Sequence, residues 1–144
     1  MKPYLLRLKP NQDVKLELLR YAQERNIKTA SIASAVGSVS SMKVRIVDGK
    51  TIVGDEQNRE VLSLSGTLIN GKIHAHIGAI STRMDVIGGH LMEGCIVHTT
   101  MEITLLDLSE EIRAERIYDS ETGFDELNLI DFWRYNLYYL VAPT

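Results

Sequence analysis

The sequence predicts an α+β domain in which a largely antiparallel β-sheet is flanked by a few helices. Three observations predict it: several segments alternate apolar and polar residues, short turn signals join them, and one early segment has the period of a helix. The 144 residues, 44% of them hydrophobic, suffice for a buried core. We therefore expect one domain over residues 1–144.

The N-terminal residues supply a strand and the helix. Residues 4–8 are mostly apolar and end before Pro10, which suits a short strand. Asp13 is a candidate N-cap for a helix that runs to about Arg25 and stops at Asn26. The residues that share the apolar face of this helix are Val14, Leu18, Tyr21 and Ala22.

The next segments predict two strands. Residues 28–36 are rich in Ala and Ser and end at Gly37; their alternation favours a strand, although a buried helix also fits so short a run. Residues 42–46 alternate apolar and basic side chains, as a half-buried strand does. A loop bracketed by Gly49 and Gly54 follows.

A β-hairpin is the clearest feature of the central segment. From Glu60 onward, one face of a strand is expected to carry Leu62, Leu64, Gly66 and Leu68. Asn70-Gly71 is a two-residue turn signal, and residues 72–80 follow as the return strand. Residues 95–106 alternate as another strand, and residues 111–117 as a further one.

Three histidines are candidate metal ligands. The two-residue period of a strand puts His74 and His76 on one face, with their side chains ~6–7 Å apart. His90 follows Gly88-Gly89, where a tight turn would bring its ring toward the other two. Three imidazoles that leave one coordination position open are typical of a catalytic-type zinc site. A histidine on a polar sheet face is also often only solvated, and we interpret His98 as such a surface residue.

Other reactive side chains indicate a functional site less strongly than the histidines do. Glu60 and Glu102 lie on polar strand faces, where either is a candidate to orient a histidine or act as a general base, or is a plain solvated residue. Cys95 is the only cysteine, which excludes an intramolecular disulfide, and its apolar strand face predicts a core position. Ser63 and Ser65 are discounted as nucleophiles because no Gly-x-Ser-x-Gly elbow surrounds them.

Charge and hydropathy argue against nucleic-acid and membrane partners. The 16 Lys and Arg residues against 19 Asp and Glu give a net charge of −3, and the basic residues are scattered. The chain therefore lacks the clustered cations that neutralise DNA phosphates. No apolar stretch approaches the ~20 residues of a membrane span, and the N-terminus lacks the apolar core of a signal peptide. We expect a cytoplasmic protein without direct DNA binding.

Four segments together resemble the PPC (plants and prokaryotes conserved) domain in order and spacing. They are residues 62–67 (LSLSGT), 72–77 (KIHAHI), 88–91 (GGHL) and 99–103 (TTMEI). The resemblance covers roughly residues 4–130. Relatives usually place an aromatic residue directly before the glutamate that corresponds to Glu60, and this chain has Arg59 there. The aromatic-rich tail at residues 131–144 lies outside the resemblance, and we expect it to pack on the core or in a subunit interface.

The resemblance implies an antiparallel α+β fold, a homotrimer, and a metal such as zinc or another divalent transition metal at His74, His76 and His90. Prokaryotic members are often described as DNA-binding, but the Arg-Gly-Arg-Pro motif of the plant relatives is missing here. Three functions remain open, of which direct DNA binding is disfavoured by the acidic pI and the missing motif. The first of the other two is a regulatory or DNA-associated assembly module whose metal serves the structure or the sensing of a small molecule. The alternative is a metal-dependent hydrolase or lyase for a small polar substrate, with Glu60 or Glu102 as base. We favour the module, because the sequence shows no complete catalytic constellation.

Overall fold

The computed structural model describes residues 1–130, which form nine β-strands and one α-helix. The predicted role of the tail at residues 131–144 falls outside the described residues. The elements in chain order are β1 (Lys2–Leu8), α1 (Val14–Glu24), β2 (Thr29–Arg45), β3 (Ile52–Asp55), β4 (Arg59–Ile69), β5 (Lys72–Ser81), β6 (Val86–Leu91), β7 (Ile96–Asp107), β8 (Ala114–Asp119) and β9 (Phe124–Leu129).

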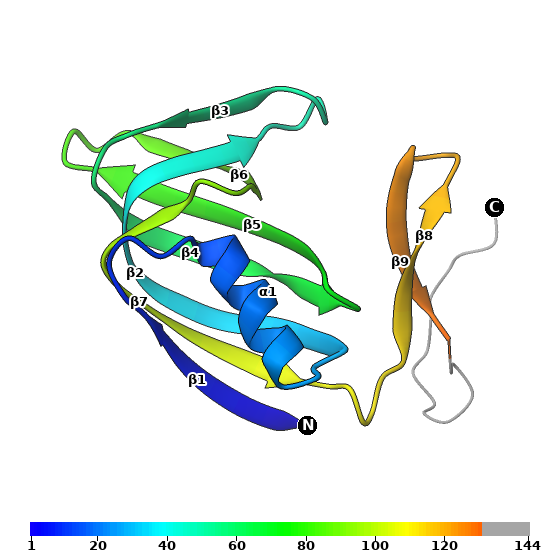
Figure 1. Ribbon diagram of the computed structural model, residues 1–144. Helices are drawn as coiled ribbons and strands as arrows, with labels where there is room; N and C mark the ends of the chain where they lie inside the picture. The colour runs from blue at the N-terminus through cyan, green and yellow to red at the C-terminus, as the bar shows by residue number, and fades with distance from the viewer. Residues whose placement is uncertain (131–144) are drawn as a thin grey trace.

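Seven strands form one antiparallel sheet that curls around the helix (Figure 1). Its order is β1-β7-β2-β4-β5-β6, and β3 pairs with the far end of β2. That end of β2 also pairs with β6, where Val44 lies opposite Leu91 and Arg45 opposite His90. Strands β2, β4, β5 and β6 therefore close into a ring. The predicted fold class is confirmed, but α1 is the only helix within residues 1–130, where a few were expected.

Helix α1 begins and ends where its capping residues predict. The Asp13 side chain accepts a hydrogen bond from the Leu16 amide (3.0 Å) and another from the Gly94 amide (2.6 Å). The helix ends before Asn26, whose φ of 54° is left-handed. Val14, Leu18 and Ala22 are buried against the sheet and make one core with it. This helix is too short and too polar to cross a membrane, and it is the only one in the described part of the chain.

Strand β2 corrects the expectation that residues 28–36 end at Gly37. The strand continues for 17 residues, and its register shifts between Gly37 and Val39. A Cβ at Gly37 would lie 2.1 Å from the Thr100 carbonyl oxygen, so the glycine permits the close approach of β7 rather than ending the strand. The two predicted strands are therefore one.

The β4–β5 hairpin confirms its turn signal and corrects one face. Asn70 (φ 46°) and Gly71 (φ 76°) both take the left-handed conformation that a two-residue turn of this kind requires. A register shift between Val61 and Ser63 buries Val61 and leaves Leu62 59% exposed, so Leu62 does not share the core face of this strand.

Strands β8 and β9 form a separate hairpin beside the main sheet (Figure 1). The predicted strand at residues 111–117 begins three residues later than expected, at Ala114. The Asn70 side-chain amide donates to the Ala114 carbonyl (2.9 Å), and Lys72 forms an ion pair with Asp125 (2.6 Å). The hairpin is thereby held over the face of the sheet that carries the histidines.

Candidate functional site

The structure brings His74, His76 and His90 together on adjacent strands. His74 and His76 project from the same side of β5, while the alternate residues Ala75 and Ile77 are buried in the core. His90 lies on β6 directly opposite His76. The ring centroids are 5.2–5.9 Å apart, and one nitrogen of each ring lies within 4.8 Å of the others. The predicted convergence of the three rings is thus present.

Gly88 and Gly89 place His90 by a different route from the one expected. They do not form a turn; the chain reverses at residues 81–85, and both glycines lie inside β6. A Cβ at Gly89 would lie 2.7 Å from the Arg45 carbonyl oxygen, and one at Gly88 would lie 2.9 Å from the Ile77 carbonyl oxygen. The two glycines therefore let β6 pack closely between β5 and β2, which puts His90 in register with His76.

Two of the three histidines, His74 and His90, favour the neutral imidazole. Partial burial, followed by the positive charge of Arg45, lowers the pKa of His90 to about 4. Burial, followed by the charge of Arg116, also lowers the pKa of His74, although Glu126 opposes that change. Within residues 1–130 no protein group makes a hydrogen bond to any of the three rings. Metal ions bind the neutral form of histidine, so these shifts suit His74 and His90 to coordination.

The spacing of the rings also fits a transition metal. Zn–N bonds of about 2.0–2.1 Å put two ligands of a tetrahedral ion about 3.4 Å apart. The nitrogens, which lie within 4.8 Å of one another, reach that spacing by small side-chain rotations. Three imidazoles suit zinc, copper, iron or nickel better than magnesium or calcium, which prefer oxygen ligands. The three histidines therefore form a group that could hold a metal ion.

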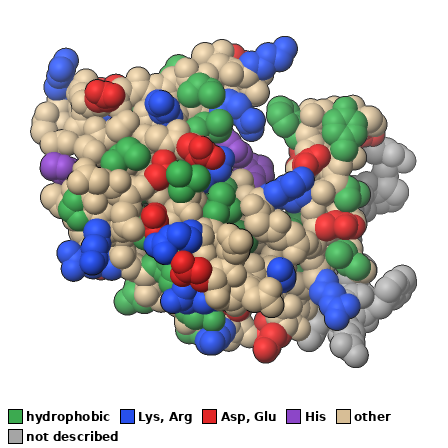
Figure 2. All heavy atoms as spheres, in the orientation of Figure 1, with side chains coloured by type: hydrophobic (Ala, Val, Ile, Leu, Met, Phe, Trp, Pro, Cys, Tyr) green, Lys and Arg blue, Asp and Glu red, His purple; other side chains and the backbone are tan. Residues whose placement is uncertain are grey.

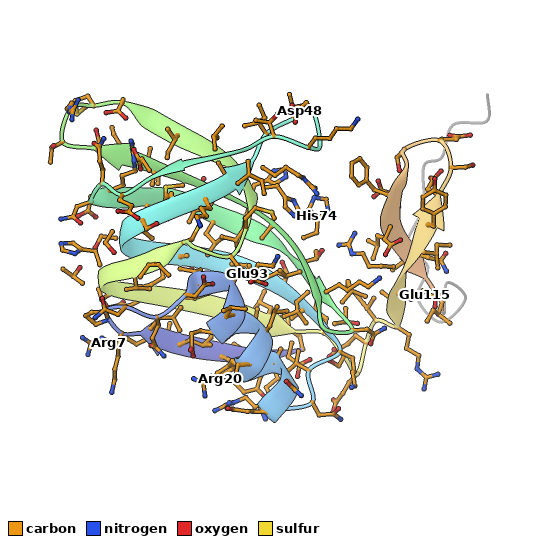
Figure 3. The ribbon with its side chains drawn as sticks, turned by 45° about the horizontal axis from the view of Figure 1, so that its top comes forward. Arg7, Arg20, Asp48, His74, Glu93 and Glu115 are labelled. Atoms are coloured by element: carbon orange, nitrogen blue, oxygen red, sulfur yellow. The ribbon has the colours of Figure 1, made fainter. Side chains whose placement is uncertain are left out.

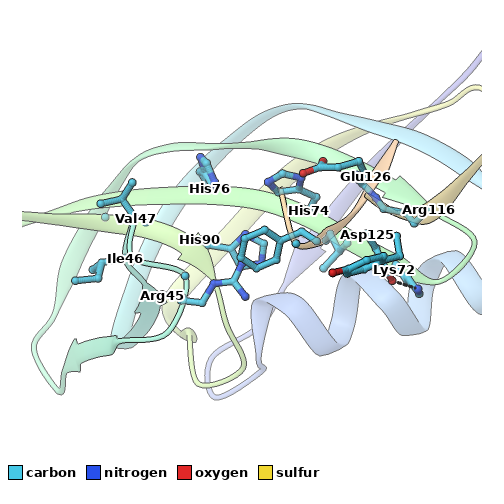
Figure 4. Close-up of a pocket in the computed structure, with 17 residues that line it drawn as sticks. Arg45, Ile46, Val47, Lys72, His74, His76, His90, Arg116, Asp125 and Glu126 are labelled. Carbon is cyan, nitrogen blue, oxygen red and sulfur yellow. Dashed lines mark hydrogen bonds and ion pairs between the residues drawn. The ribbon is translucent and has the colours of Figure 1, made fainter. Parts of the chain in front are cut away.

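The histidines line a pocket between the main sheet and the β8–β9 hairpin. Its volume is about 770 Å³, within the range of small-molecule sites. Histidine side chains are visible in the hollow beside the hairpin in Figure 2, and Figure 3 shows His74 on the side of the sheet that faces the hairpin. The other charged or aromatic lining residues, most of them labelled in Figure 4, are Arg45, Lys72, Arg116, Tyr118, Phe124, Asp125 and Glu126.

Two arginines approach the histidines from different walls of the pocket. Arg45, at the end of β2, pairs with His90 in the ladder, and its guanidinium lies 5.3 Å from the centre of the Phe124 ring. Arg116 comes from β8 and donates through Nη2 to the Thr67 hydroxyl (2.8 Å). Thr67 lies directly opposite His74 in the β4–β5 ladder, so this bond fixes Arg116 beside the cluster.

The carboxylates of the pocket are not the ones that the sequence suggested. Glu60 pairs with Ile80, four residues beyond His76, which is about 13 Å along the strand. Glu102 lies on β7, three strands away from β5, or about 14 Å across the sheet. Neither lines the pocket. The assignment of Glu60 or Glu102 as base is wrong for this site, and Glu126 is the carboxylate that neighbours His74.

The remaining sequence candidates lie apart from the pocket. His98 is exposed on β7 and does not belong to the histidine cluster, which agrees with its interpretation as a surface residue. Cys95 is fully buried in the core, as its strand face predicts.

The pocket residues that the sequence did not reveal come mainly from the β8–β9 hairpin. Arg116 and Glu126 lie some forty to fifty residues from His74 and His76, and no motif links them to the histidines. The predicted strand at residues 111–117 marked part of the hairpin, and nothing local showed which face of the sheet it covers.

A family model matches most of the chain. The model is the Plants and Prokaryotes Conserved (PCC) domain, and it matches residues 1–109. It corresponds to the PPC resemblance seen in the sequence. The matched range holds the three histidines and Arg45, whereas the β8–β9 hairpin lies beyond it.

A curated relative from Synechococcus is much longer than this chain. The bifunctional protein GlmU of Synechococcus sp. is 40% identical over 132 residues, which is 90% of this chain but 20% of the relative. The chain therefore spans about a fifth of the length of the curated relatives it matches.

Solved structures share the fold along nearly the whole chain. A hypothetical protein from Salmonella enterica superposes with a TM-score of 0.85 at 30% identity, covering 91% of this chain and 94% of that one. A metal-containing protein from Archaeoglobus fulgidus gives a TM-score of 0.71 at 29% identity, covering 88% and 92%. A protein from Bacteroides thetaiotaomicron, described as a candidate DNA-binding protein, gives 0.78 at 22% identity, covering 88% and 91%. That last likeness shows the fold alone.

Proposed function

This chain belongs to the Plants and Prokaryotes Conserved (PCC) domain family, and on that premise we propose that it binds a divalent transition metal such as zinc through His74, His76 and His90. The observation that carries the proposal is the approach of the three ligand nitrogens to within 4.8 Å, beside the pocket. A bound ion supplies a Lewis-acid centre with a coordination position left for a small ligand. The domain then serves as a metal-dependent small-molecule binding module.

Metal analysis of purified protein tests this function. After loading with zinc and removal of free ion, the wild type is expected to retain close to one zinc per chain. His76→Ala is expected to lose it, because two imidazoles alone hold zinc weakly. His98→Ala is the matched control, since it removes an exposed strand histidine outside the cluster. A wild type that retains no stoichiometric metal after loading contradicts the proposal.

We also propose that the chain assembles as a homotrimer, as the family resemblance implies. Apolar side chains are exposed on several strands of the main sheet, among them Val36 on β2 (61%), Leu62 on β4 (59%) and Val86 on β6 (57%). A contiguous exposed apolar patch marks an association surface, and we propose that these residues contribute to one. Light scattering is expected to give three times the 16.2 kDa chain mass, and Leu62→Lys is expected to lower it. Leu16→Lys on α1 serves as the control. A 16.2 kDa species at micromolar concentration argues against the trimer.

A metal-dependent hydrolase or lyase is the second candidate function. The observation that favours it is Glu126, a carboxylate in the same pocket as the histidines. A carboxylate next to a Lewis-acid centre is positioned to accept a proton from a substrate or from water. The zinc-loaded protein would then hydrolyse 4-nitrophenyl acetate faster than His76→Ala does, and Glu126→Gln would lose most of that rate while keeping its zinc. Equal rates for all three proteins speak against catalysis.

A further inference from the structure

We propose that the pocket binds a small organic oxyanion, whose carboxylate or phosphate group lies between the histidine cluster and the guanidinium groups of Arg45 and Arg116. This inference rests on the proposed metal site, and it adds the chemical class of the ligand.

The charges around the pocket favour an anion. Lys72 and Asp125 form an ion pair of 2.6 Å at the rim, so they neutralise each other. Among the described lining residues, Arg45 and Arg116 then face one remaining carboxylate, that of Glu126. The histidines supply no negative charge, so a divalent ion held by them would keep its full charge. A cleft with excess positive charge attracts anionic ligands.

Both guanidinium groups keep hydrogen-bonding capacity for a ligand. Arg116 donates only one hydrogen bond within residues 1–130, from Nη2 to the Thr67 hydroxyl, and its Nε is buried without an acceptor. Arg45 lies near the Phe124 ring and donates to no acceptor in the same part of the chain. An arginine presents five N–H donors in a planar fork that matches the oxygens of carboxylates and phosphates. A bound oxyanion would accept hydrogen bonds from these unused donors.

The two arginines are placed to hold one group in common. Figure 4 shows Arg45 and Arg116 on two sides of the histidine cluster. The β2–β6 pairing places the Arg45 backbone opposite His90, and the bond to Thr67 holds the Arg116 side chain beside His74. An oxyanion at the cluster therefore lies within the span of both side chains.

The size and the walls of the pocket indicate an organic ligand rather than a bare inorganic ion. A volume of about 770 Å³ is far larger than one phosphate ion requires. Tyr118 and Phe124 line the pocket on the hairpin side, and aromatic rings contact flat apolar groups favourably. We therefore expect the ligand to carry an apolar or aromatic body next to its charged group.

Cobalt-loaded protein tests the inference. Co²⁺ replaces zinc at histidine sites and absorbs visible light in a manner that changes with its ligands, so the spectrum reports an anion at the site. Phenyl phosphate and benzoate are the probes, and benzamide is the uncharged match of benzoate. At least one of the two anions is expected to change the spectrum and to bind in calorimetry at least tenfold more tightly than benzamide. The preference between them identifies the oxyanion.

Charge variants assign the effect to the two arginines. Arg45→Gln and Arg116→Gln are each expected to bind one equivalent of cobalt and to weaken anion binding at least tenfold. Arg83→Gln, at an exposed arginine of the β5–β6 turn, is expected to bind as the wild type does. If cobalt binds but benzamide binds as well as the anions, or both pocket variants bind anions normally, the inference is overturned while the metal site stands. Failure of the wild type to bind cobalt overturns the proposed function instead, and the inference with it.

Discussion

Acidification is expected to destabilise the metal-free protein through His90. The pKa of this residue is about 4 in the folded chain, against 6.5 for an ordinary histidine, because burial and the nearby Arg45 disfavour the imidazolium. Above pH 6.5 the ring is neutral in both states. Between pH 6.5 and 4 the unfolded chain binds a proton that the folded chain does not. The free energy of unfolding therefore falls as the pH drops through this window.

The size of the effect follows from the two pKa values. A difference of about 2.5 pKa units corresponds to an upper limit of about 3.4 kcal/mol. His90 is only partly buried, so solvent screens part of this cost and we expect about 1–2 kcal/mol. The loss is complete near pH 4, where the folded protein also begins to take up the proton.

Urea unfolding in the presence of a chelator measures this loss. The wild type and His90→Gln are compared at several pH values from 7 to 4, because glutamine has a similar size and does not titrate. Carboxylates titrate in both proteins, so the difference between their unfolding free energies reports His90 together with its coupling to His74 and His76. Proton NMR of the ring gives its pKa directly. Parallel loss of stability in the two proteins, or a His90 pKa near 6.5, would refute the reasoning.

Three substitutions test how the fold supports the site. Gly89→Ala puts a Cβ 2.7 Å from the Arg45 carbonyl oxygen, so we expect a lower melting temperature and at least tenfold weaker zinc binding. Zinc affinity equal to that of the wild type in calorimetry would contradict the role of Gly89 in bringing β6 close to β2. Asp13→Ala removes the helix cap and is expected to cost about 1–2 kcal/mol in urea unfolding without changing zinc binding. Arg59→Met removes a buried guanidinium that forms ion pairs with Asp55 and Asp85. We expect the free energy of unfolding, measured in urea, to fall by about 2–4 kcal/mol. A fall below about 0.5 kcal/mol would show that these ion pairs are dispensable for stability.

The sequence was sufficient wherever structure depends on neighbours along the chain. Helix α1 follows from Asp13 and the apolar spacing after it, and the β4–β5 hairpin follows from Asn70-Gly71. The shared face of His74 and His76 needs only the two-residue period of a strand. In each case the decisive interactions lie within a few residues of one another.

The errors arise where one strand meets another. Gly37 was expected to end a strand, and Gly88-Gly89 to form a turn, because glycine favours turns when nothing else is known. In the fold these glycines lie where a neighbouring backbone comes too close for a Cβ. The exposure of Leu62 likewise results from a register shift that only the pairing of β4 with β5 reveals.

The wall of the pocket that the β8–β9 hairpin forms could not be predicted either, because it also depends on contacts between distant segments. Arg116 and Glu126 line the pocket only because the β8–β9 hairpin lies over β5. Contacts such as the bond from Arg116 to Thr67 join residues 49 positions apart. Glu60 and Glu102 were chosen from strand faces alone, and their distance from the histidines depends on the order of strands in the sheet.

The length of β2 has a consequence for biosynthesis. Its partners β4, β6 and β7 all follow it in the chain, and β7 ends only at Asp107. While the chain is being made, both hydrogen-bonding edges of this 17-residue strand are open until β3 and β4 follow, and the edge that pairs with β7 stays open until β7 is made. Strands with an open edge pair with other molecules. The nascent protein is therefore most exposed to aggregation between the synthesis of β2 and that of β7, and a ribosome-associated chaperone would protect it most in that interval.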